Sequence, residues 1–233
     1  MPDCMKNWQE NDCPDNFRNK NLLFLSLSSS GMMTAKAKIR FTMKGVYMFF
    51  ADGFEETEAL ATADVMRRGG IDVKKVSITG SLGVSSSHGV HVLADMTFGE
   101  FKNSVVLEGT TPQDVMVFPG GLPGSDNLAA CKELMDMMLK HYEEGGCVAA
   151  ICAAPSVVLG LLPDLKGKKM TCYDGFEPAL IEKGVEYTKE GVVTDGNIIT
   201  GRGAGHAVSF GLAIVAYLKG QEAADQVAHS IML

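Results

Sequence analysis

The sequence lacks an excess of positive charge, a long apolar run and a C-x-x-C pair. The formal net charge is −7, and because the first 43 residues are slightly basic, the remainder is more acidic still and does not attract nucleic acid or anionic membranes. No apolar run approaches the roughly 18 residues that span a bilayer. The six cysteines form no C-x-x-C motif, and a chain of this size needs no disulfide framework. We therefore expect a soluble protein of a reducing, cytoplasmic compartment.

The first 43 residues differ from the rest because they are polar and show no regular period. The apolar stretch from Leu22 to Leu27 is short and contains a serine, and acidic residues precede it, which argues against a targeting segment. We expect residues 1–43 to be a disordered or non-native extension, with a targeting segment as the alternative. Residues 44–233 then form a single domain, since the chain is 46% hydrophobic and 21% charged, as globular proteins are.

From Gly45 onward, strand patterns alternate with helix patterns. A strand over 45–51, a helix over 55–70 and a strand over 72–79 make a βαβ unit, which implies parallel strands. The later pattern consists of a hairpin-like excursion over 88–101, a strand over 114–121, a helix over 125–146 with Ser125 or Asp126 as N-cap, a strand over 147–152, a helix from near Pro155, a strand over 168–173, a helix over 177–183, a strand over 185–189, a hairpin over 191–200 and two helices over 205–231. This order predicts a three-layer α/β sandwich, in which functional residues gather at the carboxyl ends of the strands.

Cys152 lies at a corner of the chain. The residues before it form an apolar strand pattern, whereas Pro155 suits the first turn of a helix. The flanking Ala150 and Ala154 give a small-x-Cys-x-small pattern, which has the steric logic of a nucleophile elbow. A helix N-terminus beside the sulfur would stabilise a thiolate and lower its pKa. The alternative is that Cys152 is a buried small hydrophobe, as free cysteines often are.

Gly120 and Gly121 directly follow an apolar strand in the segment FPGGLPGS. Backbone N–H groups freed by such a turn can point at an oxyanion, and Gly121 together with Ala153, the residue after the candidate nucleophile, would form the donor pair. A tight turn without function is the alternative. The segment holds neither a P-loop nor a complete G-x-G-x-x-G motif.

Glutamates 55, 56 and 58 open the first predicted helix, where acidic residues commonly serve the helix dipole. One of them would reach Cys152 if the strand over 45–51 lies beside the cysteine strand, and it could then share a proton with the thiol. Among the five histidines, His206 is the one that we place near the strand ends. No spacing of His and Cys matches a zinc motif, so we expect no metal.

Four motifs, in this order and spacing, carry a resemblance to a known family: GFEETEA, VFPGGLPGSDNL, VAAICAAP and TGRGAGHAVSFGLAIV. They resemble the ThiJ/PfpI superfamily, and within it the DJ-one branch of parkinsonism-associated protein deglycases. The similarity runs from about Lys44 to the C-terminus. It implies a flavodoxin-like, class I glutamine amidotransferase-like α/β/α sandwich with a mainly parallel sheet, usually a homodimer, that needs no cofactor.

The resemblance also implies roles for single residues. Cys152 looks like the nucleophile and redox-sensitive thiol, and Glu58 looks like the protonated carboxyl that hydrogen-bonds its sulfur. Gly120, Gly121 and Ala153 match the backbone donors around the site.

Arg202, in the R-G-x-G segment, is placed by the resemblance where it shapes the site at or near the dimer contact. Tyr173 stands where some members have a histidine near the cysteine, and Ala153 stands where the protease-like branch has one. A Cys–His pair is therefore not expected. Arg202, Tyr173 and His206 complete the candidate substrate-binding set.

We predict a cofactor-independent enzyme in which Cys152 acts on reactive dicarbonyls or their adducts, as a glyoxalase III or protein deglycase does. The alternative from a different class is a redox-sensing stress chaperone whose signal is the oxidation of Cys152. A peptidase and a thiazole-biosynthesis protein rank below these two. The third hypothesis is an α/β domain that has no catalytic activity.

Overall fold

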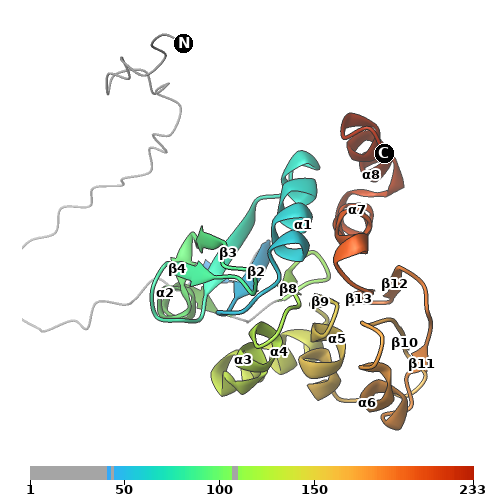
Figure 1. Ribbon diagram of the computed structural model, residues 1–233, viewed down its shortest axis with the longest axis horizontal. Helices are drawn as coiled ribbons and strands as arrows, with labels where there is room; N and C mark the ends of the chain where they lie inside the picture. The colour runs from blue at the N-terminus through green and yellow to red at the C-terminus, as the bar shows by residue number, and fades with distance from the viewer. Residues whose placement is uncertain (1–40, 43–44, 107–109) are drawn as a thin grey trace, which may run out of the picture. The chain divides into compact units, whose positions relative to one another are not determined.

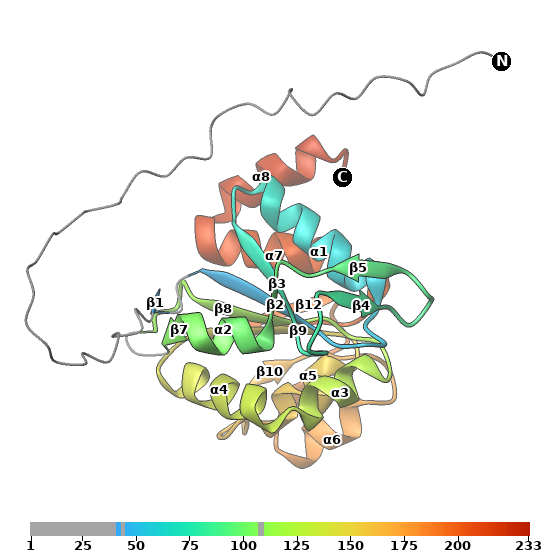
Figure 2. The same ribbon diagram turned by 90° about the vertical axis from the view of Figure 1, so that its left-hand side faces the viewer.

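A seven-stranded sheet forms the middle layer of the protein (Figures 1 and 2). The computed structural model describes residues 41–42, 45–106 and 110–233. Along the sheet the strands are β12 (Val192–Asp195), β13 (Ile198–Gly201), β9 (Cys147–Ile151), β8 (Val115–Phe118), β2 (Val46–Phe50), β3 (Val73–Ser77) and β6 (Met96–Thr97). The pairing of β12 with β13 is antiparallel and the other pairings in this sheet are parallel. The predicted mainly parallel α/β/α sandwich is confirmed.

Helices cover both faces of the sheet, as Figure 2 shows. One face carries α1 (Glu56–Arg68), α7 (Ala207–Lys219) and α8 (Gln221–Ser230), and the other carries α3 (Gly124–Ala130), α4 (Lys132–Glu143), α5 (Ala154–Val157) and α6 (Glu177–Glu182). The strands are buried on both sides because their residues alternate between the two cores. In β9, Val148 and Ala150 join one core, and Ala149 and Ile151 join the other.

The predicted helix over 125–146 is wrong in two respects. It is two helices, α3 and α4, because Cys131 between them has a non-helical backbone with ψ of 85°. Neither Ser125 nor Asp126 is the N-cap, since α3 begins at Gly124 and Pro123 precedes it without a side-chain cap. The helix expected near Pro155 is also short, because α5 ends at Val157 and a 3-10 turn, η1 (Leu159–Leu161), follows.

The segment between β3 and β8 contains more secondary structure than the hairpin-like excursion that the sequence predicts. It contains an antiparallel hairpin of β4 (Gly83–Ser85) and β5 (His91–Leu93), the edge strand β6 and a helix, α2 (Phe98–Ser104), that the sequence did not indicate. Two short parallel pairs lie outside the main sheet, namely β10 (Lys169–Met170) with β11 (Glu186–Tyr187) and β1 (Phe41–Thr42) with β7 (Val105–Val106).

Strand β1 lies before the predicted domain start at Lys44. The other predictions for residues 1–43, including the targeting alternative, fall outside the described residues. Within the described part of the chain, no helix has the length and apolar character that crossing a membrane requires.

Candidate active site

Cys152 occupies the sharp corner that the sequence predicts. It directly follows β9 and has a φ of 68°, a left-handed conformation that is strained for any residue with a Cβ. Its backbone is held on both sides, because its N–H donates to Gly201 O at 2.9 Å and its carbonyl accepts from Tyr173 N–H at 2.8 Å. The thiol is therefore presented at the carboxyl end of the sheet by backbone bonds that do not use the side chain.

The glycine-rich segment after β8 packs backbone to backbone against the loop before α1. Glu55 N–H donates to Gly120 O at 2.9 Å, and Gly124 N–H donates to Gly53 O at 3.1 Å. A Cβ atom at Gly121, which has a φ of +91°, would lie 2.4 Å from the Glu55 nitrogen. Larger residues would therefore push the start of α1 away from the cysteine corner.

Glu58 lies in the first turn of α1 and is buried, with 1% of its surface exposed. Its Oε2 accepts the Gly120 N–H at 3.0 Å, and its carboxyl hydrogen-bonds the Cys152 thiol. The sequence predicts this contact on the condition that the strand over 45–51 lies beside the cysteine strand. That condition is wrong, because β8 lies between β2 and β9. Glu58 reaches Cys152 across the end of β8 because Gly120 there has no side chain, and a Cβ at Gly120 would lie 2.5 Å from both partners.

The surroundings raise the pKa of both members of this pair. Burial raises the pKa of Glu58 to about 7, against the opposing effect of its hydrogen bond with Cys152. Burial, followed by the charge of Glu58, raises the pKa of the Cys152 thiol to about 12. The N–H groups of Gly121 and Ala153 bond the sulfur and act in the opposite direction. The carboxyl therefore loses its proton before the thiol does.

This order of titration differs from the lowered cysteine pKa that a helix N-terminus predicts. Helix α5 behind the sulfur has four residues, and its donors do not outweigh burial and the adjacent carboxylate. At neutral pH the pair consists of a thiol beside a partly ionised carboxylate. At this pH the thiol can attack an electrophile when Glu58 accepts its proton as the sulfur bonds.

The structure brings together Cys152, Glu58, Gly120, Gly121 and Ala153 at one point, and it places the other three candidates beside it. Tyr173, Arg202 and His206 line an adjoining surface hollow of about 390 Å³. Arg202 is paired there with Asp174, whose carboxylate lies 2.7 Å from its Nη2. Sequence reasoning missed Asp174. Its position directly after the candidate residue Tyr173 was the signal that could have identified it.

Glu55, Glu56 and His88 form another group of polar side chains, with potential ligand atoms within 4.8 Å of one another. Each has a structural partner. Glu55 caps α1 by accepting the Glu58 N–H at 2.6 Å, and His88 lies 3.1 Å from Glu56. The absence of a metal stays a prediction from the sequence.

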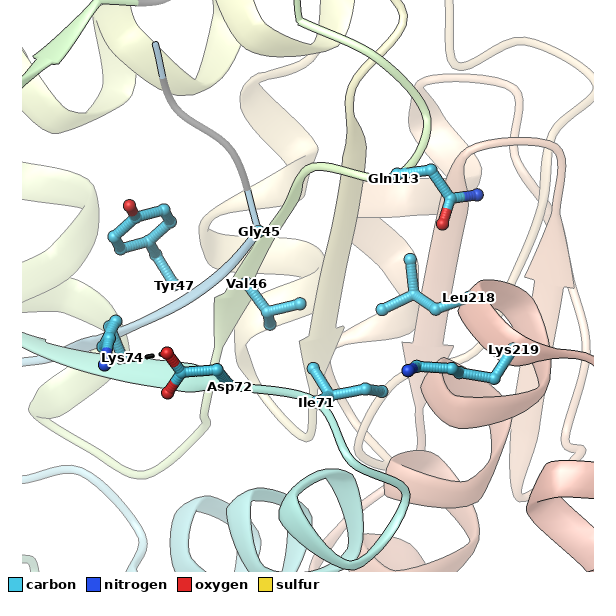
Figure 3. Close-up of a pocket in the computed structure, with 9 residues that line it drawn as sticks. All are labelled: Gly45, Val46, Tyr47, Ile71, Asp72, Lys74, Gln113, Leu218 and Lys219. Atoms are coloured by element: carbon cyan, nitrogen blue, oxygen red, sulfur yellow. Dashed lines mark ion pairs between the residues drawn. The ribbon is translucent and has the colours of Figure 1, made fainter. Parts of the chain in front are cut away.

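A second hollow, of about 260 Å³, lies at the amino ends of β2 and β3, the opposite end of the strands from Cys152 (Figure 3). Its lining includes Tyr47, Gln113 and an ion pair between Lys74 and Asp72 at 2.9 Å. It contains neither a cysteine nor a histidine. The chemistry of the described residues therefore points to the end of the sheet that carries Cys152.

The chain matches a known protein family over most of its length. The DJ-1/PfpI family model matches residues 44–217. Protein DJ-1 homolog A of Arabidopsis thaliana is 37% identical over 190 residues, which are 82% of this chain and 47% of that protein, so the chain spans about half of that relative.

Two animal proteins match over most of their own length. Protein dj-1beta of Drosophila melanogaster is 35% identical over 82% of this chain and 97% of its own. Its crystal structure superposes with a TM-score of 0.72 at 34% identity, covering 82% of this chain and 99% of the other. The protein named glutathione-independent glyoxalase DJR-1.2 of Caenorhabditis elegans is 30% identical over 77% of this chain and 90% of its own. The chain belongs to the DJ-1/PfpI family.

Proposed function

We propose that this protein is a cofactor-independent glyoxalase that converts α-ketoaldehydes such as methylglyoxal, free or as early adducts of amines and thiols, into α-hydroxy acids. The contact between the buried Glu58 carboxyl and the Cys152 thiol carries the proposal, because it pairs a nucleophile with a base of pKa about 7. The name of the Caenorhabditis elegans relative, a glutathione-independent glyoxalase, supports it.

The reaction follows from the positions of these groups. The Cys152 sulfur adds to the aldehyde carbon as Glu58 takes the thiol proton, and the N–H groups of Gly121 and Ala153 hold the resulting oxyanion. Glu58 returns this proton to the oxyanion, which gives a neutral hemithioacetal and a free carboxylate. Glu58 then moves the hydrogen of that carbon to the neighbouring ketone carbon through an enediol, while the hydroxyl proton passes to the ketone oxygen, which leaves a thioester of the hydroxy acid. Water hydrolyses the thioester and restores the thiol. The sum is ketoaldehyde plus water to hydroxy acid, with no external oxidant or reductant.

The direct test is to incubate the purified protein with methylglyoxal and to measure lactate. We expect lactate from the wild type and none above background from Cys152→Ala. Cys131→Ala, which removes another free and partly exposed thiol, is the matched control and should remain active. Equal lactate from the wild type and Cys152→Ala would rule out the proposal.

A second candidate function, the redox-sensing stress chaperone, is supported by the partial exposure of Cys152, which Cys131 shares, whereas Cys147 and Cys172 are buried. Mild peroxide should then add oxygen at Cys152 before the other cysteines, as measured by peptide mass spectrometry. Oxidation spread evenly over the cysteines would contradict a sensing role.

We also propose that the protein is a homodimer. Leu82, Val90 and Leu93 are exposed on or beside the β4–β5 hairpin, with 71% of Leu93 accessible, and Leu60 is exposed on α1. Such apolar side chains are typical of an interface between subunits. Light scattering should give the mass of a dimer for the wild type and that of a monomer for Leu93→Lys. A monomeric wild type at micromolar concentration would contradict this.

A cytoplasmic location belongs to the same proposal. All four described cysteines are free, as a reducing compartment would keep them. Cell fractionation of the endogenous protein tests the location, and recovery in an organelle or in the medium would contradict it.

A further inference from the structure

The hollow beside Cys152 is built on that residue's own backbone. Its volume is about 390 Å³, and its two walls are the segments 173–174 and 202–206. The first wall begins where Tyr173 N–H bonds Cys152 O, at 2.8 Å, and the second follows Gly201, whose carbonyl accepts the Cys152 N–H at 2.9 Å. Both walls of the hollow are therefore anchored to the backbone of the residue that carries the thiol.

The walls are flat and partly apolar. Half of the Tyr173 surface is exposed, and its ring lies against the backbone of Gly203, where a Cβ would come within 3.3 Å of it. On the other side the His206 ring packs against Gly191, where a Cβ would lie 2.4 Å from Nδ1. An extended or planar substituent fits such a surface better than a compact, fully hydrated one.

Arg202 is the cation of the hollow, and most of its N–H donors are already engaged. Its Nη2 donates to both carboxylate oxygens of Asp174, at 2.7 and 2.8 Å, and its Nε donates to Oδ1 at 3.1 Å. Its Nη1 donates to Lys189 O at 3.2 Å. The hydrogen bond with Arg202 lowers the pKa of Asp174, so the carboxylate is charged at neutral pH. Asp174 thus occupies the place that a substrate carboxylate would take on the guanidinium.

We propose that Asp174 determines the substrate specificity of this site by excluding carboxylate-bearing substituents and admitting neutral ones. A carboxylate entering the hollow must displace Asp174 or lie beside its negative charge, and juxtaposed like charges are a strong selective element. Lys189 is exposed and lies outside the lining, and its charge acts on Asp174 in the same direction as that of Arg202, by lowering the pKa of that carboxyl. The proposal rests on the proposed function only in taking Cys152 as the reacting group.

The first experiment needs no turnover. Cys152 is alkylated with neutral N-ethylmaleimide or with anionic 3-maleimidopropionate, and mass spectrometry of the Cys152 peptide gives the two rates. In each case the sulfur bonds one alkene carbon and the other carbon gains a proton. We expect the ratio of neutral to anionic rates to exceed that of the uncharged thiol N-acetylcysteine amide by about tenfold, a smaller effect than a buried like-charge contact would give, because the Asp174 side chain is partly exposed.

The variants separate Asp174 from general charge effects. Asp174→Asn should lower the ratio at least about fivefold, because Arg202 becomes free for the incoming carboxylate. The double variant Asp174→Asn/Arg202→Met should lose this gain in the anionic rate. Asp225→Asn on α8, outside the hollow, is the matched control and should leave the ratio unchanged. A wild-type ratio equal to that of N-acetylcysteine amide, or a ratio unaffected by Asp174→Asn, would overturn the proposal.

Turnover then distinguishes a failure of this inference from a failure of the glyoxalase function. The wild type should convert the methyl ester of 4,5-dioxopentanoate with a higher kcat/KM than the free acid, and Asp174→Asn should narrow the difference. If methylglyoxal is converted but acid and ester are equal, the specificity proposal fails. If no dicarbonyl is converted while the alkylation ratio behaves as expected, the glyoxalase function fails and charge selection by Asp174 stands.

Discussion

The backbone N–H of Gly120 donates to Oε2 of Glu58 at 3.0 Å, at the end of the strand that separates Glu58 from Cys152. This hydrogen bond and the missing side chain of Gly120 together determine where the Glu58 carboxyl lies. The carboxyl can cross over β8 and contact the thiol, and it is held there by a donor that cannot rotate away.

Replacing Gly120 with alanine tests this close approach. The new Cβ would lie 2.5 Å from Cys152 Cβ and from Glu58 Oε2, and 2.8 Å from Ile151 O, so one of them must move. We expect a loss of about 1–3 kcal/mol in the free energy of unfolding, as for other overpacked sites, together with a large loss of methylglyoxal turnover. Urea denaturation and lactate formation measure the two effects.

Gly160→Ala is the matched control for this variant. Gly160 is buried, and no atom outside its own neighbourhood lies within 4 Å of the position of its Cβ. It should keep both stability and turnover. If Gly120→Ala behaves like Gly160→Ala, the contact between Glu58 and Cys152 does not depend on Gly120.

The raised pKa of Glu58 predicts how stability depends on pH. Its pKa rises from 4.5 to about 7 on folding, so between these values the folded state holds a proton that the unfolded state has lost. The resulting stabilisation is fully present below pH 4.5 and disappears as the pH rises through 7, and it amounts to about 3 kcal/mol by linkage.

Urea denaturation of the wild type and Glu58→Gln from pH 4.5 to pH 8 measures this effect. The wild type should become less stable relative to the variant as the pH rises. Glu222→Gln, an exposed charge removal on α8, is the control and should parallel the wild type. A constant difference between wild type and Glu58→Gln would contradict a buried carboxyl that titrates near pH 7.

Glu58→Gln should also change reactivity and turnover in opposite directions. The charge of Glu58 is one cause of the raised Cys152 pKa, so its removal should lower that pKa and speed alkylation by iodoacetamide at pH 8 to 9. Turnover of methylglyoxal should fall by about 10²–10⁴, the usual contribution of a positioned base. If alkylation falls together with turnover, the loss of Glu58 as a base outweighs the effect of its charge on the Cys152 pKa, which contradicts the predicted gain in thiol reactivity.

Much of the main sheet could be predicted from the sequence because each strand shows its own local pattern. The elbow could be predicted for the same reason, since the alanines around Cys152 and Pro155 after it are neighbours in sequence. The position of Glu58 could not be derived in this way. It depends on the strand order, in which β8 intervenes between β2 and β9, and on the space that Gly120 leaves at the end of β8.

The pKa of Cys152 and the role of Arg202 could not be predicted from local sequence patterns either, because both depend on tertiary contacts. A helix start predicts a lower cysteine pKa, but the degree of burial and the charge of Glu58 come from segments far apart in the chain. Likewise Arg202 by itself suggests an anion site. Only the tertiary contact with Asp174, 28 positions away, shows that most of the Arg202 donors are taken.

The buried histidine of α4 offers a last prediction, on stability at acid pH. His141 is fully buried, and its Nε2–H donates to Cys147 O at 2.9 Å, just where β9 begins. Burial lowers the pKa of His141 below its ordinary value, and the nearby Asp114 and Glu144 do not reverse this. The unfolded chain therefore takes up a proton first as the pH falls, and the stability present above pH 6.5 declines below it.

His141→Phe removes the titrating group and keeps a ring for Gly146 to pack against. At pH 7.5 it should be less stable by about 1 kcal/mol, the cost of one lost hydrogen bond. Between pH 6.5 and pH 4.5, however, its free energy of unfolding should fall less steeply than that of the wild type. His229→Gln on α8, where the side chain is exposed, is the control and should follow the wild-type curve. Parallel curves for His141→Phe and the wild type in urea denaturation would show that His141 is not the group that makes the fold sensitive to acid.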